Sequence, residues 1–367
     1  MEFVVNREVL LPALGKVTGV VERRQTLPIL GNLLLVVHND QMTVTGTDLE
    51  VEVNMVVPIE LHQAGEITIP ARKLIDICRN LSEANDIRFR IKDDRCLVTA
   101  GRARFTLGVL PAANFPLMDS LQDGFQFKVN ESIFRRLLDK TAFAMAQQDV
   151  RYYLNGLLIE FHANTLTAVA TDGHRLARFQ SQIAVGIGES RQVIVPSKTV
   201  LELRRLLGSS DELVSVILGE RFIQIAMGGA MTMTSKLVDG RYPEYERVIP
   251  RELEKTASVN KNELKRALSR TAILSNEKYR GVRLTFDAGT LRLLAHNPEQ
   301  EEAEEEIELN YGDESISIGF NVSYLIDVLG AIDGTEVQIK FQDANSSSIW
   351  RGMDLEDETY VVMPMRL

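Results

Sequence analysis

Cysteine is nearly absent from this chain of 367 residues, which contains only Cys78 and Cys96. The two lie outside any Cys-x-x-Cys arrangement, so the sequence predicts neither a disulfide framework nor a zinc site. The five histidines show no spacing typical of metal ligands. We therefore expect two ordinary thiols in or near the core, and we expect no metal and no cofactor.

Long apolar runs are missing as well. No stretch reaches the roughly 18 residues that span a bilayer, and residues 1–7 lack the basic and apolar segments of a signal peptide. These features predict a cytoplasmic protein that makes no contact with a membrane. No low-complexity tract is present, and a charged fraction of 25% is ordinary for a globular protein. The length exceeds one ordinary core, so we expect two or three domains.

Motifs of enzymes are also lacking. The chain has no Gly-x-Ser-x-Gly and no Walker A sequence, and the glycines at 186 and 188 lack the third glycine of a dinucleotide fingerprint. His174 follows Asp172 by two residues and is the one tempting acid–base pair, but such neighbours on a turn need not converge. The sequence therefore indicates a protein that is not an enzyme.

Three copies of one pattern are present, at a period of about 125 residues. Each copy opens with an apolar strand that ends in Val-Asn, at residues 5–6, 129–130 and 259–260. A polar turn then begins at Thr47, Thr171 and His296, and a second helix opens near Pro70, Pro196 and Asn321. Each copy closes near a proline, at Pro116, Pro243 and Pro364. The repeat predicts three domains, at residues 1–120, 121–250 and 251–367.

Each copy reads as two helices plus two antiparallel sheets, an α+β fold. Helices are expected over residues 6–24, 70–80, 130–146, 196–208, 260–275 and 321–332. Asn6, Asn130 and Asn260 suit N-caps, and Pro12 suggests that the first helix bends or starts late. Core-facing stripes are expected from Ile133, Leu137, Leu138 and Met145, and from Leu264, Ala267, Leu268 and Thr271. Strands are expected at 33–37, 157–161, 214–218 and 337–341.

The formal net charge of −10 argues against a nucleic-acid ligand, because most DNA-binding proteins carry a basic excess. The charge is unevenly distributed, however: the six expected helices sum to +9 and the remainder to −19. Two interpretations remain open. Either the helices together form a basic face that attracts a polyanion, or each is an ordinary solvated helix.

Longer motifs resemble the beta subunit of bacterial DNA polymerase III, the sliding clamp, along the full chain. They begin at Thr26, Thr45, Gln148, Ala170, Ser235, Ile273 and Tyr360, and include TLPILGN, QDVRYYLNG, ATDGHRL and YVVMPMRL. The resemblance implies half of a six-domain closed ring, formed by a head-to-tail homodimer with helices lining the hole. It implies a processivity factor that encircles double-stranded DNA, independently of sequence, and slides on it.

The resemblance also implies a dimer interface, in which Phe105 and Leu107 of one copy meet Ile273 and Leu274 of the other. The run from Glu299 to Glu308 has seven acidic residues in ten. It either faces Lys73, Arg102 and Arg104 across that interface or forms a solvated edge. The DNA contacts implied by the resemblance are Arg24, Arg72, Gln148 and Tyr153. Helix residues such as Lys198 are expected to supplement them, and all would touch phosphates without reading bases.

A cleft for partner peptides is the last site that the resemblance implies. Its walls are Leu154, Thr171, Gly173, His174, Arg175, Leu176, Pro243, Arg247, Val248, Asn321, Tyr324, Ser347, Val361, Met363, Pro364, Met365 and Arg366. The expected partners are the replicative polymerase alpha subunit, the clamp-loader ATPase, repair polymerases and other proteins with clamp-binding peptides. The alternative is a repeat scaffold that binds peptides without encircling DNA.

Overall fold

The computed structural model describes residues 1–22, 27–82, 86–119, 124–183 and 190–367. They form two units, Met1–Ser132 with Glu202–Leu237, and Ile133–Leu201 with Val238–Leu367. The division passes through the second of the three expected copies. The reason is that two sheets each continue from one copy into the next.

The described residues contain six α-helices, two from each copy. They are α1 (Arg7–Val17), α2 (Ala71–Asn80), α3 (Glu131–Thr141), α4 (Ser197–Leu206), α5 (Lys261–Thr271) and α6 (Val322–Ala331). Asn6 accepts a hydrogen bond from the Glu8 amide, and Asn260 from the Asn262 and Glu263 amides, which confirms these two N-caps.

The first helix of each copy (α1, α3 and α5) is shorter than expected, and the α3 stripe is confirmed at Leu137 and Leu138 but not at Ile133 or Met145. α1 ends at Val17 because Thr18 closes its last turn by donating to the Leu14 carbonyl, and it starts at Arg7 despite Pro12. In α3 the buried aromatic residue is Phe134, whereas Ile133 is only half-buried. Met145 is buried but lies after the helix and a following 3-10 turn. The α5 stripe is confirmed in full.

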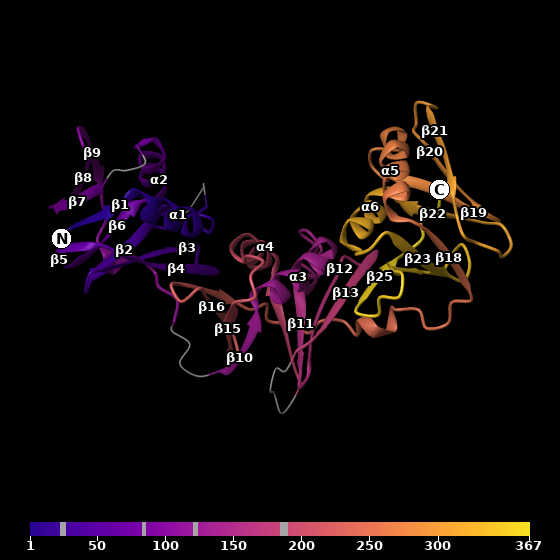
Figure 1. Ribbon diagram of the computed structural model, residues 1–367, viewed down its shortest axis with the longest axis horizontal. Helices are drawn as coiled ribbons and strands as arrows, with labels where there is room; N and C mark the ends of the chain where they lie inside the picture. The colour runs from indigo at the N-terminus through magenta and orange to yellow at the C-terminus, as the bar shows by residue number, and fades with distance from the viewer. Residues whose placement is uncertain (23–26, 83–85, 120–123, 184–189) are drawn as a thin grey trace. The chain divides into compact units, whose positions relative to one another are not determined.

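The unit Met1–Ser132 with Glu202–Leu237 holds two antiparallel sheets (Figure 1). The first has the order β5 (Glu60–Gln63), β1 (Glu2–Asn6), β7 (Asp86–Lys92), β8 (Arg95–Ala100), β9 (Ala103–Gly108). The second has the order β10 (Phe125–Asn130), β15 (Leu213–Leu218), β16 (Phe222–Met227), β17 (Met231–Lys236), β4 (Val51–Pro58), β3 (Gln41–Thr47), β2 (Asn32–His38), β6 (Gly65–Pro70).

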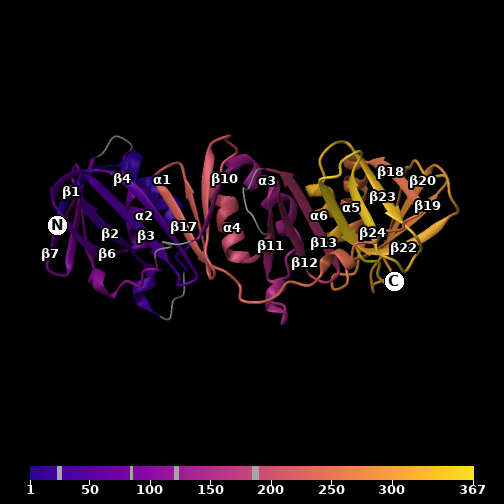
Figure 2. The ribbon, with the colours of Figure 1, turned by 90° about the horizontal axis from the view of Figure 1, so that it is seen from below.

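The other unit also holds two sheets. The larger has the order β14 (Arg191–Pro196), β11 (Gly156–His162), β12 (Thr165–Thr171), β13 (Arg175–Gln182), β25 (Glu358–Val362), β24 (Ser348–Gly352), β23 (Glu336–Phe341), β18 (Lys255–Asn260). The smaller has the order β21 (Glu302–Glu308), β20 (Thr290–His296), β19 (Gly281–Asp287), β22 (Ile316–Asn321). Figure 2 shows β18, β23 and β24 side by side, and α5 and α6 pack against one another in this unit.

The two shared sheets join neighbouring copies by one rule. β4 of the first copy pairs antiparallel with β17 of the second, with Val51 opposite Ser235. β13 of the second copy pairs with β25 of the third in the same way, with Arg175 opposite Val362. In each case the strand after the polar turn pairs with the last strand of the next copy. The strands left over under this rule are β21 and β9, and each lies at the edge of its sheet.

Basic side chains at helix ends reinforce both junctions. Arg205 of α4 donates to the Gly15 and Lys16 carbonyls at the end of α1, at 3.0 and 2.6 Å. Lys140 of α3 donates to the Ala331 carbonyl at the end of α6, at 2.5 Å, and to Glu358 at 2.8 Å. Cations are favourable at helix C-termini, where unpaired carbonyls carry partial negative charge.

Both cysteines lie in the core. Cys78 of α2 and Cys96 of β8 are buried and form no disulfide. Burial raises the pKa of each thiol to about 12, so both stay protonated at neutral pH. The expectation of ordinary thiols is confirmed. Among the described residues, no helix combines the length and apolar character needed to cross a membrane.

Candidate functional site

The turn between β12 and β13 begins one wall of the expected cleft. Asp172 accepts from the amides of His174 and Arg175 at 2.9 and 3.0 Å, and Thr171 Oγ1 donates to the Arg175 carbonyl at 2.6 Å. Gly173 has a φ of 88°, a conformation that favours glycine. The turn is therefore held tightly. The carboxylate of Asp172 has a structural role here, which accounts for its position near His174.

Arg175 lies behind this turn, with its side chain only 10% exposed. It donates to Asp172 at 3.1 Å, to Asp327 at 2.6 Å and to the Phe143 carbonyl at 2.7 Å. Its guanidinium also lies 4.4 Å from the ring centroid of Tyr324, a cation–π distance. Arg175 thus fixes the Tyr324 ring of α6, which stacks with His174 at 6.5 Å.

The expected wall residues fall into three groups by exposure. Three are buried in an apolar cluster with Tyr242 and Tyr245, namely Leu154, Leu176 and Val361. Nine are half-buried, namely Thr171, Gly173, Arg175, Asn321, Tyr324, Ser347, Met363, Pro364 and Met365. Five are exposed, namely His174, Pro243, Arg247, Val248 and Arg366. The half-buried and exposed groups are the ones that a peptide can touch without repacking the core.

The segment of residues 363–367, here called the tail, continues from β25. The β13–β25 register places Leu176 opposite Val361, and the Met363 amide donates to the His174 carbonyl at 3.0 Å. The tail therefore runs directly beside the 171–175 turn. On the α6 side, Asn321 caps the helix by accepting from the Ser323 and Tyr324 amides.

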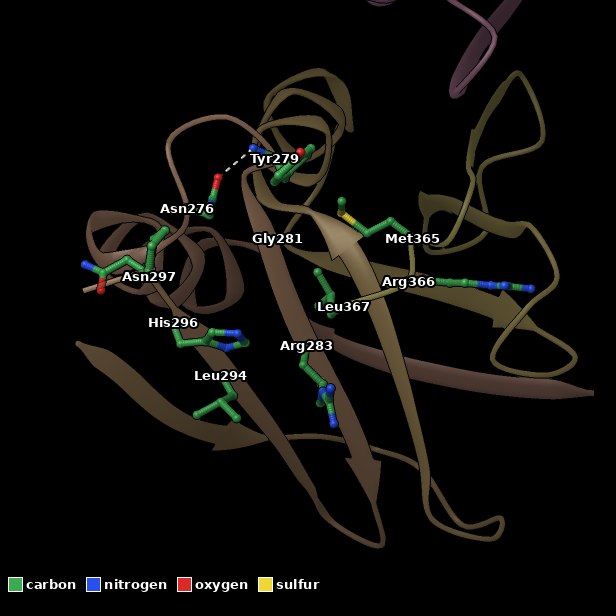
Figure 3. Close-up of a pocket in the computed structure, with 11 residues that line it drawn as sticks. Asn276, Tyr279, Gly281, Arg283, Leu294, His296, Asn297, Met365, Arg366 and Leu367 are labelled. Atoms are coloured by element: carbon green, nitrogen blue, oxygen red, sulfur yellow. Dashed lines mark hydrogen bonds between the residues drawn. The ribbon is translucent and has the colours of Figure 1, made fainter. Parts of the chain in front are cut away.

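Two cavities in the unit Ile133–Leu201 with Val238–Leu367 include expected wall residues. One, of about 340 Å³, is lined by Pro243 and Arg247 and by Tyr245, whose hydroxyl donates to the buried Glu160 at 2.5 Å. The other, of about 530 Å³, is lined by Met365 and Arg366 together with further residues (Figure 3). Those residues, none of which belongs to the expected cleft wall, are Asn276, Tyr279, Gly281, Arg283, Leu294, His296, Asn297, Pro298 and Leu367.

Of the residues expected to contact DNA, Gln148 and Tyr153 lie in one loop. Gln148 is exposed with a φ of 55°, and Tyr153 is half-buried against the edge of Tyr152. Arg151 holds this loop by a two-pronged pair with Asp149, at 3.0 and 2.9 Å. That pair, with the Arg151 amide, lowers the pKa of Asp149 to about 2. Arg151 also donates to the Asp172 carbonyl at 3.4 Å, so one side chain braces both the loop and the cleft turn.

The other expected DNA contacts lie on helices. Arg72 is exposed on α2, and Lys198 is half-buried on α4. Arg24 lies outside the described residues. The net charge of +9 counted for the helices overstates the positive charge available to DNA phosphates, because some helix cations form ion pairs within the chain. Lys140 is buried beside Glu358, and Arg136 of α3 pairs with Asp333 at 2.9 Å.

The residues expected at a dimer interface lie on edges. Phe105 is half-buried and Leu107 is buried, both on the edge strand β9. Ile273 is 76% exposed and Leu274 is half-buried, in the 3-10 turn after α5. On β21, Glu305 pairs with Arg270 at 2.5 Å and Glu304 with Arg292 at 3.5 Å. Part of the acidic run is therefore compensated within the chain.

Metal chemistry has no evident centre in the ranges that the structure covers. The His, Cys, Asp and Glu side chains described there form no group of three suited to a metal ion.

The residues that the sequence did not indicate mostly position the cleft residues. Tyr242 accepts a hydrogen bond from the Thr171 amide through its hydroxyl. The others are Arg151, Phe143 and Asp327. Their side chains are distant in sequence from those they position, and no local motif marks them.

Together, the three like α+β copies, the sheets shared between them and the exposed edges define a repeat protein of the clamp type. The chain belongs to the DNA polymerase III beta subunit family. The models of the family's N-terminal, central and C-terminal domains match residues 1–119, 128–244 and 246–366.

Individual relatives agree with this assignment along the whole length. The chain is 52% identical over 368 residues to the beta sliding clamp of Pseudomonas aeruginosa, with all of both chains covered. A crystal structure of the DNA polymerase III beta subunit from that organism superimposes with a TM-score of 0.97, at 52% identity and full coverage of both chains. A second Pseudomonas aeruginosa clamp structure, bound to griselimycin, gives a TM-score of 0.96 at 52% identity, again with all of both chains covered.

Proposed function

We propose that this chain is a processivity factor of DNA replication, a non-catalytic sliding clamp that works as a homodimeric ring around duplex DNA. The observation that carries the proposal is the junction rule, by which the strand after the polar turn of one copy pairs with the last strand of the next copy. This rule leaves β21 and β9 without such a partner, each at the edge of its sheet. Membership of the DNA polymerase III beta subunit family supports it independently.

The junction rule specifies how two chains would join. Within the chain, a strand after the polar turn pairs with the last strand of the next copy, as in β4 with β17 and β13 with β25. Applied once more, the rule pairs β21 with β9 of a second chain, and the same pairing at the other end closes a ring of six copies. A heterologous contact that closes in this way gives a finite assembly.

Charge and apolar surface favour the same pairing. β21 carries Glu302, Glu304, Glu306 and Glu308 as exposed side chains, whereas β9 carries Arg104 and has no acidic residue. Ile273 is an exposed apolar side chain close to β21, because the 3-10 turn that carries it contacts that strand. An unpaired edge strand is otherwise a liability, and a partner strand satisfies its free amides and carbonyls.

DNA would be held by charge without base recognition. Arg72, Lys198, Gln148 and Tyr153 are the proposed contacts in the described residues, and Arg24 is proposed from sequence alone. A ring retains DNA topologically, so it needs few and weak phosphate contacts, and an acidic total charge of −10 is compatible with this mode. Weak contacts also permit sliding.

The cleft would receive short peptides of the polymerase alpha subunit, the clamp loader and repair polymerases. Its accessible residues include Met363 and Met365, flexible side chains that adapt to several similar ligands, and the fixed Tyr324 ring. Griselimycin binds the Pseudomonas aeruginosa relative, and we propose that the cleft of this chain also binds it. Domain boundaries near residues 120 and 250, and a cytoplasmic location, complete the proposal.

The test is retention on DNA of defined topology. The chain is loaded onto a nicked circular plasmid by a bacterial clamp loader with ATP, then passed through a sizing column at high salt. We expect co-elution with the circle and loss of the protein after the plasmid is cut once. Equal retention on circular and linear DNA would reject encirclement, and retention on neither, with peptide binding intact, would favour the scaffold alternative.

A further inference from the structure

We infer that Gly281 and Gly319 form a notch that holds the tail in place and thereby positions the Met363 to Met365 wall of the cleft. This inference rests on the proposed function, because it assigns the two glycines a positioning role in partner binding. Neither glycine was indicated by the sequence, and neither belongs to the expected cleft wall.

The two glycines lie on paired strands directly beneath the tail. Gly281 begins β19 and Gly319 lies in β22, where it pairs with Arg283 of β19. A Cβ atom added at Gly319 would lie 2.4 Å from the Met365 carbonyl oxygen and 2.8 Å from Leu367 Cγ. One added at Gly281 would lie 2.3 Å from Leu367 Cδ2. A Cβ atom at either position therefore requires part of the tail to shift.

Hydrogen bonds secure the tail at Met363 and at Met365. The Met363 amide donates to the His174 carbonyl at 3.0 Å, and the Met365 amide donates to the Gly319 carbonyl at 2.8 Å. Pro364, between them, has no amide hydrogen to donate. The tail thus runs from the 171–175 turn to β22, and the notch determines how closely it can approach that strand.

The docked tail also forms one side of the 530 Å³ cavity. Figure 3 shows Gly281, Leu367 and Met365 on one side and His296 with Asn297 on the other. Leu367 is 46% exposed, so the notch holds its inner face while the outer face remains open to the cavity. Displacing Leu367 would therefore alter the cavity and the cleft wall together.

The two positions differ in how a clash can be relieved, which gives a graded expectation. At Gly319 the nearest atom is backbone, so Gly319→Ala must displace the tail. At Gly281 it is the end of a side chain, which can rotate. We expect Gly319→Ala to weaken partner binding roughly tenfold or more, and Gly281→Ala about threefold or less, since only molecules with a docked tail bind.

The experiment measures griselimycin affinity by calorimetry, and retention of the chain on immobilised polymerase III alpha subunit, for the full-length homodimer. Gly312→Ala is the matched control, because a Cβ there meets no atom within 4 Å. Hydrogen exchange of the Met365 amide is read in the same samples, and solution mass reports whether dimerisation is intact. We expect faster Met365 exchange in Gly319→Ala and no change in Gly312→Ala.

A double-mutant cycle covers the possibility that Gly319→Ala does not fold. Gly281→Ala is measured alone and combined with Leu367→Ala, which removes the colliding side chain. We expect the cost of Gly281→Ala to disappear in the Leu367→Ala background.

Unchanged affinity and unchanged Met365 exchange in Gly319→Ala would overturn the inference, as would equal losses in Gly319→Ala and Gly312→Ala, or additive effects in the cycle. If the unmodified chain binds neither probe, the proposed function fails, while the exchange data still report whether the notch holds the tail.

Discussion

Ile273→Ala tests the proposed dimer contact quantitatively. Ile273 is an apolar side chain that is 76% exposed in the single chain, at the position expected to meet β9 of a partner. Replacing it with alanine removes three carbon atoms, worth about 0.8 kcal/mol each when buried, or about 2 kcal/mol after scaling by exposure. A closed dimer has two equivalent interfaces, so one replacement acts twice. The loss is about 4 kcal/mol, which is between about 100- and 1,000-fold in the dimer dissociation constant.

The assay is solution mass as a function of protein concentration, by sedimentation or mass photometry. Leu213→Ala is the control, because Leu213 is also exposed, at 56%, but begins β15, which belongs to a sheet that contains neither β9 nor β21. The control should dimerise like the unmodified chain. If Ile273→Ala changes the dissociation constant no more than Leu213→Ala does, then Ile273 is not buried on association and the proposed contact is wrong.

Three further predictions follow from the charged groups. Lys140→Met should lower the free energy of unfolding in urea by about 3–5 kcal/mol, because it leaves Glu358 buried without its cation. Adding Glu358→Gln should restore much of the lost stability. A Lys140→Met variant as stable as the unmodified chain would contradict this prediction. Arg72→Ala should reduce the salt slope of DNA binding by about 0.9 without changing the dimer mass, as expected for one lost phosphate contact. An unchanged slope would remove Arg72 from the DNA contacts. The pair with Arg151 lowers the pKa of Asp149 to about 2. This pair should therefore stabilise the loop above pH 4, and the stabilisation should be lost as the pH falls toward 2. NMR titration of the Asp149 carboxyl measures this, and a titration near pH 4 would show that the pair does not persist in solution.

Periodicity and capping predicted the repeated elements well. The α5 stripe and the Asn6 and Asn260 caps were readable because they depend on residues within one or two helical turns. The end of α1 was misjudged because the residues after Val17 are apolar enough to continue a helical pattern, while the chain turns at Thr18. Met145 was placed in α3 because the apolar residues after Thr141 likewise continue the helical pattern, while the chain forms a 3-10 turn there. Its burial arises from packing that no local spacing specifies.

The candidate site was only partly readable from sequence. The resemblance supplied the wall residues, but it could not separate those in the core, such as Leu176 and Val361, from those on the surface. Arg175 illustrates a second limit, since its role depends on Asp327 and Tyr324, about 150 residues away. Charge counting overstated the accessible positive charge for a related reason, because the pairing of Lys140 with Glu358 spans 218 residues. Such contacts are properties of the assembled fold.

Closure of two chains around DNA through β9 and β21 is the central claim, and covalent trapping tests it most directly. Thr106 and Glu304 are exposed on these strands, and both native cysteines are buried, so Thr106→Cys combined with Glu304→Cys can be bridged by a bis-maleimide reagent after loading on circular DNA. The account predicts a cross-linked dimer that stays with the circle in denaturing detergent and is released when the DNA is cut. A cross-linked product that leaves intact circular DNA under denaturing conditions would contradict it.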